Sequence, residues 1–301
     1  MEQRKGILLA VGAYFVWGLG PIFWNTLASV PALQILSHRI LWSVPLLFAI
    51  IAGRRRLGVL ATCLRSPQTA AVALVGGLLL ATNWGVFVWA VNSDHIVDAS
   101  LGYFINPLVS VALGVVVLGE RLSGAQRVAV GIAAIGVIGM TILVGVIPWI
   151  ALVLAFSFGT YGLLKKRRNA APPFEGLFME TAFVAVPALV YLAVLAGEGE
   201  GAFGSSPSTT LLLISAGAFT VTPLVLFGAS AQRIPLSLLG ILQYIAPTMH
   251  LIIGVTVFGE AVSSGEWFGF ILVWIALIIY TVDNARTTAA RSAAVRAHSQ
   301  S

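Results

Sequence analysis

The sequence predicts an all-α polytopic membrane protein in which ten transmembrane helices form an inverted five-plus-five repeat. Three observations support this prediction. Only 9% of the 301 residues are charged and 58% are hydrophobic, so a water-soluble fold could not cover its surface with polar side chains. Long uncharged stretches recur along the chain, and the lysines and arginines gather between alternate pairs of them. A short motif near residue 107 returns 140 residues later.

Proline and glycine divide the uncharged stretches into segments of membrane-spanning length. A helix needs about 20 apolar residues to cross the ~30 Å hydrocarbon layer. The uncharged run 128–164 is too long for one crossing, and glycine and proline in 145–148 divide it. Residues 29–31 divide the run 6–37 in the same way. The predicted spans are 7–27, 33–52, 70–91, 99–118, 128–146, 148–164, 176–196, 211–230, 236–258 and 267–283.

The positions of lysine and arginine predict which side of the membrane each loop occupies. If the N-terminus is cytoplasmic, 16 of the 17 lysines and arginines fall on the cytoplasmic side, and only Arg39 lies within a span. The outer loops then carry acidic residues and no basic one, which is the positive-inside pattern. We therefore expect a multi-pass protein of the cytoplasmic membrane with both termini cytoplasmic. The net charge of +6 follows from this orientation and does not indicate a nucleic-acid partner.

A motif in the fourth span returns in the ninth at a constant offset of 140 residues. It pairs Pro107, Gly114, Val115, Val117, Gly119, Glu120 and Ser123 with Pro247, Gly254, Val255, Val257, Gly259, Glu260 and Ser263. Each half then holds five spans, and because five is odd, the two halves enter the membrane in opposite orientations. Inverted repeats of this kind are typical of secondary transporters, whose substrate site lies near the membrane midplane.

The repeat also predicts the division of the chain. Residues 1–146 form the first repeat, residues 147–283 the second, and the Ala/Arg/Ser-rich residues 284–301 a disordered cytoplasmic tail. The Gly-Glu pairs at 119–120 and 259–260 lie at helix ends on opposite sides of the membrane. We interpret them as structural turns or gates rather than substrate ligands.

His38, Arg39 and Glu180 are ionisable residues inside predicted spans, where a charge costs at least ~2.5 kcal/mol and therefore needs a structural or functional reason. His38 and Arg39 lie near the outer end of the second span. On a cavity wall, Arg39 would attract an anionic or polar substrate group; the alternative is an arginine that snorkels to the headgroups. His38 is either a group that titrates during transport or a structural histidine. Glu180, near the cytoplasmic end of the seventh span, either carries a proton or pairs with a cation.

Polar residues around two prolines predict the wall of a central cavity. Tyr103 and Asn106 share one helical face just before Pro107. Corresponding proline interruptions in two halves favour a binding site between them, whereas the alternative is a packing kink with polar contacts between helices. The further candidates for the cavity are Gln243, Tyr244 and His250 around Pro247, with Trp17, Asn83, Trp84 and Tyr161.

Several segments resemble one family of membrane proteins. They are Ala-Ser-Leu-Gly-Tyr-Phe-Ile-Asn-Pro-Leu at 99–108, Gly-Glu-Arg at 119–121, Ser-His-Arg-Ile-Leu-Trp-Ser at 37–43, Thr-Asn-Trp-Gly at 82–85 and Glu-Thr at 180–181. In order and spacing the chain resembles the RarD subfamily, in the EamA-type branch of the drug/metabolite transporter superfamily. The resemblance implies ten helices, an inverted repeat, a central cavity and efflux of the chloramphenicol type. Trp24-Asn25 stands where the family often has lysine, so no role of that lysine is carried over.

These observations favour a secondary transporter that moves a small metabolite or drug-like molecule by alternating access. Proton coupling through His38 or Glu180 is a hypothesis, and the choice between monomer and homodimer stays open. We expect no metal or cofactor, because the sequence has no P-loop, zinc motif or C-x-x-C, and its single Cys63 cannot form an internal disulfide. The alternatives are an intramembrane enzyme acting on a lipid or isoprenoid, which would need acid and base residues clustered at one depth, and a non-transporting scaffold with a filled core.

Overall fold

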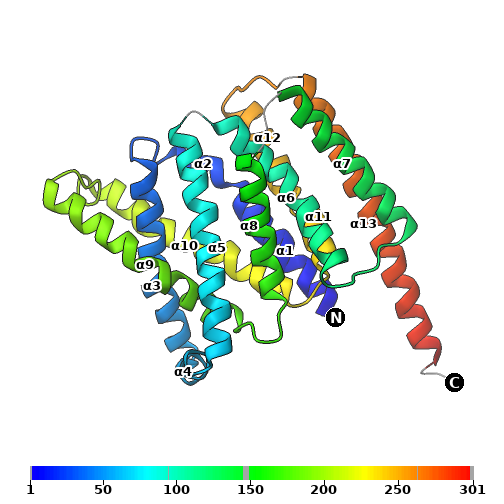
Figure 1. Ribbon diagram of the computed structural model, residues 1–301, viewed down its shortest axis with the longest axis horizontal. Coiled ribbons are helices and arrows are strands. Elements are labelled where there is room, and N and C mark those ends of the chain that lie inside the picture. The colour runs from blue at the N-terminus through cyan, green and yellow to red at the C-terminus, as the bar shows by residue number, and fades with distance from the viewer. Residues whose placement is uncertain (1, 94, 145–148, 263, 299–301) are drawn as a thin grey trace.

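The chain is entirely helical over the residues that the structure, a computed structural model, describes, namely 2–93, 95–144, 149–262 and 264–298 (Figure 1). The helices are α1 (Glu2–Gly18), α2 (Gly20–Asn25), α3 (Ala32–Gly53), α4 (Leu57–Arg65), α5 (Pro67–Asn92), α6 (Ile96–Val116), α7 (Gly124–Val144), α8 (Trp149–Lys165), α9 (Pro173–Glu198), α10 (Pro207–Ala231), α11 (Leu236–Leu242), α12 (Ile245–Val257) and α13 (Ser264–His298).

Seven described segments are long and apolar enough to cross a membrane. They are Glu2–Asn25, Ala32–Gly53, Pro67–Ala90, Pro173–Glu198, Pro207–Ala231, Leu236–Val257 and Trp267–Thr287. Three shorter apolar helices, Leu101–Val116, Gly124–Gly139 and Trp149–Lys165, accompany them. The chain is therefore an all-helical, multi-pass membrane protein. All of these segments coincide with predicted spans, and the count of ten crossings stays a prediction.

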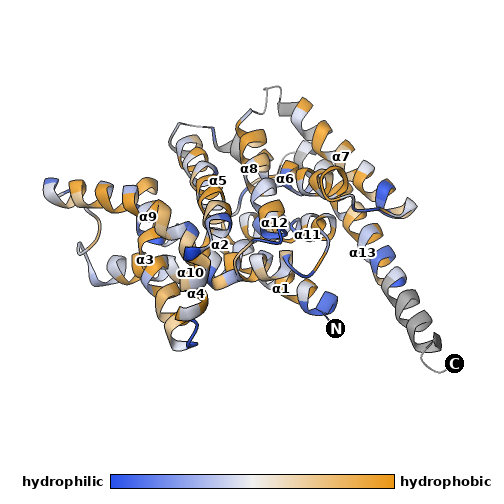
Figure 2. Cartoon of the chain, turned by 60° about the horizontal axis from the view of Figure 1, so that its bottom comes forward, coloured by the Kyte–Doolittle hydropathy of each residue, from blue (hydrophilic) through white to orange (hydrophobic). Residues whose placement is uncertain are grey.

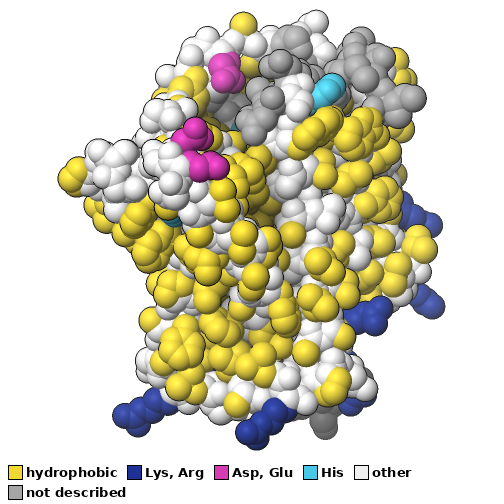
Figure 3. All heavy atoms as spheres, turned by 60° about the vertical axis from the view of Figure 1, so that its left-hand side comes forward, with side chains coloured by type: hydrophobic (Ala, Val, Ile, Leu, Met, Phe, Trp, Pro, Cys, Tyr) yellow, Lys and Arg dark blue, Asp and Glu magenta, His cyan; other side chains and the backbone are white. Residues whose placement is uncertain are grey.

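The outer surface divides into an apolar band and two polar ends. Figure 2 shows hydrophobic residues along most helices and hydrophilic residues concentrated at helix ends and turns. In Figure 3 a broad hydrophobic band separates lysine and arginine side chains, which gather toward the lower end, from acidic side chains at the upper end. An exposed apolar surface of this extent is unsuited to water and suited to lipid.

Two of the predicted spans are broken rather than continuous. The first span consists of α1 and α2, and the ninth consists of α11 and α12. Pro21 and Pro247 each lie in the first turn of the second piece, where a missing N–H removes no intrahelical hydrogen bond. Pro107 differs from the prediction, because it lies inside the continuous helix α6. The hydroxyl of Tyr244 donates to the carbonyl of Phe104 in the preceding turn, at 3.1 Å, and so supplies a hydrogen bond near the proline.

The structure departs from the sequence prediction in two further places. Helix α4 occupies the arginine-rich loop, where no helix was predicted, and it buries Leu60 and Cys63 against Ala73 and Met179. Helix α13 continues to His298, through much of the tail that the composition predicts to be disordered; alanine and arginine are both strong helix formers. The predicted break at 145–148, with the boundary between the repeats, lies outside the described residues.

The helices pack in a pattern that matches the predicted repeat. If each span corresponds to the span five places later, then α1 corresponds to α8, α3 to α9, α5 to α10, α6 to α11 with α12, and α7 to α13. The contact between α1 and α10 has its counterpart in the contact between α8 and α5. The contact between α3 and α10 likewise has its counterpart in the contact between α9 and α5. The pairs α3–α9, α6–α11 and α7–α13 each join corresponding spans.

Close helix approaches repeat as well. At Gly18, an added Cβ would lie 2.5 Å from the sulfur of Met249, and at Gly159 it would lie 2.9 Å from a methyl carbon of Val109. Residues 109 and 249 are separated by the same 140-residue offset as the sequence motif. A side chain at either glycine would force these helices apart, and the two glycines lie one in each predicted half.

Candidate functional site

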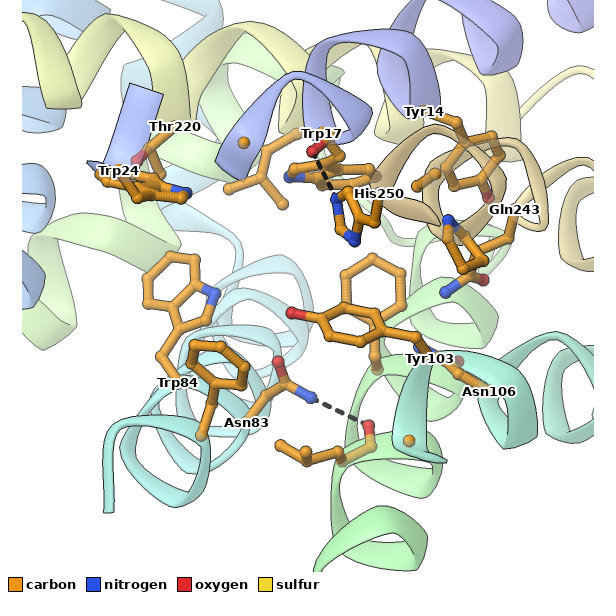
Figure 4. Close-up of a pocket in the computed structure, with 18 of the residues that line it drawn as sticks. Tyr14, Trp17, Trp24, Asn83, Trp84, Tyr103, Asn106, Thr220, Gln243 and His250 are labelled. Atoms are coloured by element: carbon orange, nitrogen blue, oxygen red, sulfur yellow. Dashed lines mark hydrogen bonds between the residues drawn. The ribbon is translucent and has the colours of Figure 1, made fainter. Parts of the chain in front are cut away.

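A cavity of about 390 Å³ lies in the middle of the bundle (Figure 4). Its wall is built from α1, α2, α3, α5, α6, α8, α10 and α12, with Gln243 from the turn between α11 and α12, so both predicted halves contribute to it. Eight of the residues predicted for the cavity line it, namely Trp17, Arg39, Asn83, Trp84, Tyr103, Asn106, Gln243 and His250. Pro247 lines it as well, beside the break between α11 and α12.

Aromatic rings form most of the apolar wall. Trp17 packs edge-on against Phe158, with ring centroids 5.6 Å apart, and the two rings come from the first helix of each predicted half. Tyr103 packs edge-on against His250 at 5.7 Å. Figure 4 shows Trp24 and Trp84 on one side of the cavity and Asn106 and Gln243 on the other. The cavity therefore has apolar walls with different polar groups at its two ends.

Two polar side chains of the wall have fixed roles within the protein. The side-chain amide of Asn83 donates to the carbonyl of Leu154 at 2.9 Å and to the hydroxyl of Ser157 at 3.0 Å (Figure 4). The Nε2 atom of His250 lies 3.1 Å from the carbonyl oxygen of Trp17. Because a carbonyl only accepts hydrogen bonds, Nε2 carries the proton and donates. These bonds hold α5 against α8 and α12 against α1.

Arg39 is held by aromatic faces. Its guanidinium carbon lies 4.4 Å from the ring centre of Trp84 and 5.4 Å from that of Trp24. Cations over tryptophan faces are attracted by the electron-rich ring. The Nε atom is buried and has no hydrogen-bond partner among the described residues. The guanidinium therefore lines the cavity and does not snorkel to the membrane surface.

Three residues predicted for the cavity wall do not line it. His38 is buried beside Phe203, with ring centroids 5.2 Å apart. Tyr244 is fully buried, with its hydroxyl on α6. Tyr161 is also fully buried, and its hydroxyl donates to Oε2 of Glu180 at 3.0 Å. Because each polar group of the two tyrosines finds a partner within the bundle, these residues support the wall from behind.

Glu180 forms a buried ion pair with Lys165. Both side chains are at most 6% exposed. Of the two roles expected for Glu180, the structure shows the pairing with a cation. The carboxylate also accepts a hydrogen bond from the hydroxyl of Tyr161. From the sequence, Lys165 is the first residue of the basic run 165–168, which is expected on the cytoplasmic side. It also directly follows an apolar span. Helix α8 continues through Lys165 and so carries the ammonium group inward to Glu180.

The two Gly-Glu turns have the same backbone geometry. Gly119 and Gly259 adopt left-handed φ angles of 66° and 68°, which glycine reaches without a Cβ clash. The N–H of the following glutamate donates to the carbonyl of Gly114 in one turn and of Gly254 in the other, both at 3.0 Å. The α6–α7 and α12–α13 turns lie at opposite ends of the bundle (Figure 1).

Polar contacts join the predicted halves at the basic end of the bundle. Glu120 accepts the backbone N–H groups of Leu236 and Ser237 at 2.6 and 2.9 Å. These groups begin α11 and have no acceptor within their helix, and the positive end of the helix dipole favours a carboxylate there. A separate contact joins Arg56 to Glu175, to which its Nε donates at 2.6 Å. The turn at Glu120 is thus a contact between the halves and lies outside the cavity wall.

The ammonium group of Lys166 binds the turn between α10 and α11, directly before the N–H groups that Glu120 accepts. It donates to the carbonyls of Ala231 and Ile234 at 3.1 and 2.6 Å. Burial lowers the pKa of Lys166 from its usual value, and the nearby Glu120 opposes that shift. This lysine therefore closes the C-terminal end of α10 just before α11 begins.

Comparisons with known proteins identify the family. The model of the EamA-like transporter family matches twice, at residues 4–142 and at 146–282. Protein RarD of Streptomyces exfoliatus is 47% identical over 287 residues, covering 95% of this chain and 91% of that protein. The chain belongs to the RarD subfamily of the EamA-like transporters. Chloramphenicol-sensitive protein RarD of Pseudomonas aeruginosa is 30% identical over 286 residues, covering 94% of this chain and 95% of that protein.

A solved crystal structure shares the fold of this EamA-like membrane transporter. It matches with a TM-score of 0.71 at 20% sequence identity, and the match covers 92% of this chain and 97% of the other. At this level of identity the likeness concerns the fold alone.

Sequence reasoning missed several aromatic residues of the cavity wall, the hydroxyl of Thr220 and the partner of Glu180. Trp24 was noted only as a departure from the family pattern, yet it lines the cavity beside Arg39. Thr220 lines the cavity with an unpaired hydroxyl, but a threonine in an apolar span often bonds its own helix and gives no signal. Lys165 had one usable signal, its position next to an uncharged span that holds Tyr161.

The buried pair of Lys165 and Glu180 predicts a specific pattern of stability. Lys165→Met leaves the carboxyl group without its cation, and breaking a buried pair costs about 3 to 5 kcal/mol. Adding Glu180→Gln removes the charge while keeping an acceptor for Tyr161, so the double variant should recover most of the loss. Thermal unfolding of the purified variants measures this. A single variant as stable as the double variant would contradict the account.

Proposed function

We propose that this EamA-like transporter is a secondary carrier that moves a small metabolite or drug-like molecule across the cytoplasmic membrane by alternating access to the central cavity. The observation that carries the proposal is a cavity of about 390 Å³ between two repeated halves. Its volume is within the range of about 300 to 1,000 Å³ typical of small-molecule sites, and its mixture of aromatic walls and few polar groups is also typical.

The inverted repeat supports the mechanism. Two halves, residues 1–146 and 147–283, would each contribute five spans. The family model matches each half separately, corresponding helices pack in corresponding pairs, and the Gly-Glu turns have equal geometry at opposite ends of the bundle. Two similar, opposed halves can exchange conformations and so expose one central site to either side in turn.

The contacts at the basic end would act as the cytoplasmic gate. The segregation of basic side chains toward one end (Figure 3) supports a cytoplasmic location for that end and for both termini. There Glu120 joins the α6–α7 turn to α11, and Arg56 joins the first half to Glu175. These bonds must separate when the cavity opens to the cytoplasm.

Transport fits the cavity better than the alternative of intramembrane catalysis. The cavity wall, over the described residues, contains no aspartate, glutamate or cysteine, and His250 already donates to a backbone carbonyl. General acid–base catalysis needs a group that can exchange a proton with the substrate. A scaffold with a filled core fits less well still, because the centre of the bundle is hollow.

Cysteine accessibility tests alternating access. In a Cys63→Ala background, single cysteines at Thr220 and Ala246 should react with a membrane-impermeant maleimide from either side of sealed vesicles, because the cavity opens to each side in turn. Ile142→Cys, on the apolar exterior at 72% exposure, is the control and should stay unlabelled. Removing the gate contact with Glu120→Ala should increase labelling from the cytoplasmic side. Labelling of both cavity positions from one side only would contradict the proposal.

Proton coupling is proposed for Glu180, with His38 as the second candidate. Since Lys165 already balances Glu180, coupling requires that the pair separate during the transport cycle. The Lys165→Met/Glu180→Gln variant should then fold and exchange substrate across the membrane but no longer accumulate it against a gradient. His38→Gln is tested in the same way. Concentrative uptake in vesicles is the measurement, and unchanged accumulation would remove the replaced residue from coupling.

A further inference from the structure

The cavity has one formally charged side chain among its described lining residues, and that charge is positive. Neither aspartate nor glutamate occurs in the described wall. The ion pairs of the described residues involve other basic side chains, and none includes Arg39. The two tryptophan rings beside the guanidinium attract it through their faces, but they supply neither a counter-charge nor an acceptor in the plane of its N–H groups.

An unpaired guanidinium at this depth is energetically unfavourable. Buried charges in proteins are normally paired and hydrogen-bonded, because a low-dielectric surrounding penalises an isolated ion. The same protein follows this rule at Glu180, where Lys165 balances the carboxylate. At Arg39 the buried Nε has no acceptor among the described residues. The group that would complete this site is therefore an anion that enters the cavity.

A second unpaired group lies at the same end of the cavity. Thr220 is 4% exposed, and its hydroxyl has no hydrogen-bond partner among the residues that the structure describes. Figure 4 places Thr220 beside Trp24, whose ring contacts Arg39. A hydroxyl that donates to one oxygen and a guanidinium fork that donates to the other match the two oxygens of a carboxylate.

The opposite end of the cavity is polar and uncharged. The side-chain carbonyl of Asn106 is buried and has no partner within the described part of the chain, and Figure 4 shows Gln243 close to it. Between the two ends lie the rings of Tyr103 and Trp17 (Figure 4), and Phe158 packs edge-on against Trp17. A molecule that fills this space has an acidic group at one end, a flat apolar middle and, at the other end, a group that forms hydrogen bonds with amides.

We propose that the cargo is a small organic monoanion, a carboxylate with an aromatic or similarly flat apolar body, whose carboxylate binds Arg39 and Thr220. This inference rests on the proposed function and names the chemical class of its substrate. A neutral compound leaves the guanidinium unpaired. A cation meets a like charge and finds no carboxylate in the described wall. The cavity charge therefore selects the anion over neutral and cationic molecules of the same shape.

Three probes that share one skeleton test this selectivity. The full-length protein, purified in detergent, is titrated by calorimetry with 3-phenylpropionate, 3-phenylpropanamide and 3-phenylpropylamine. The anion should bind at least about tenfold more tightly than the amide, as expected for a charge-assisted pair, and the amine should bind most weakly. Chloramphenicol, which is neutral, provides a fourth comparison and should bind no more tightly than the anion.

Matched variants identify the origin of the preference. Arg39→Gln should reduce the affinity for the anion to that for the amide and leave amide binding within about threefold of wild type. Arg39→Lys keeps the charge without the planar fork and should retain part of the preference. Arg127→Gln, an exposed arginine on α7 that does not line the cavity, is the control and should bind like the wild type.

Two results would overturn the inference. One is equal or weaker binding of the anion by the wild type, including no binding at millimolar concentration. The other is an anion preference that survives in Arg39→Gln. The wild-type comparison alone decides the question if a variant fails to fold. If cavity cysteines react from both sides while the anion shows no preference, the transporter stands and only its cargo class is wrong.

Discussion

Hydrocarbon offers no hydrogen-bond partner, and this constraint decides where the few charged side chains of the chain lie. Most of the charged groups gather at the two ends of the bundle, outside the broad apolar band (Figure 3). Backbone groups are satisfied inside helices, and the breaks near Pro21 and Pro247 lie beside the central cavity rather than on the lipid-facing surface. Irregular backbone at membrane depth is tolerated in such a position, where it lines a cavity. The same constraint thus determines both the outer surface and the location of the site.

Inside the bundle the constraint is met in two different ways. Glu180 is balanced by Lys165 and Tyr161, so that part of the interior is complete without any ligand. Arg39 has aromatic neighbours and, over the described residues, no anionic partner. We therefore interpret Glu180, Lys165 and Tyr161 as a structural or coupling cluster, and the surroundings of Arg39 as a binding surface. The proposed preference for an anion rests on this single cationic group, in a cavity otherwise lined by rings and neutral polar groups.

The sequence predicted the spans well because lipid imposes length and apolarity on every crossing. The motif shared by residues 107–123 and 247–263 likewise predicted two turns that have the same geometry. Local sequence did not predict the partner of Glu180, because Lys165 stands in a basic run that also fits the positive-inside rule. It also placed Tyr161 and Tyr244 on the cavity wall, although their hydroxyls bind within the bundle. The direction in which such a side chain points depends on helix packing, which hydropathy does not encode.

The opposed orientation of the two halves is the central claim, because alternating access depends on it. Single cysteines in place of Arg121 and Ala261, in the two corresponding turns of a Cys63→Ala background, test it with an impermeant reagent applied to intact cells and to inside-out vesicles. The account predicts that the cysteine at 121 reacts only from the cytoplasm and the cysteine at 261 only from outside. Reaction of both positions from the same side would contradict the inverted repeat and the mechanism that follows from it.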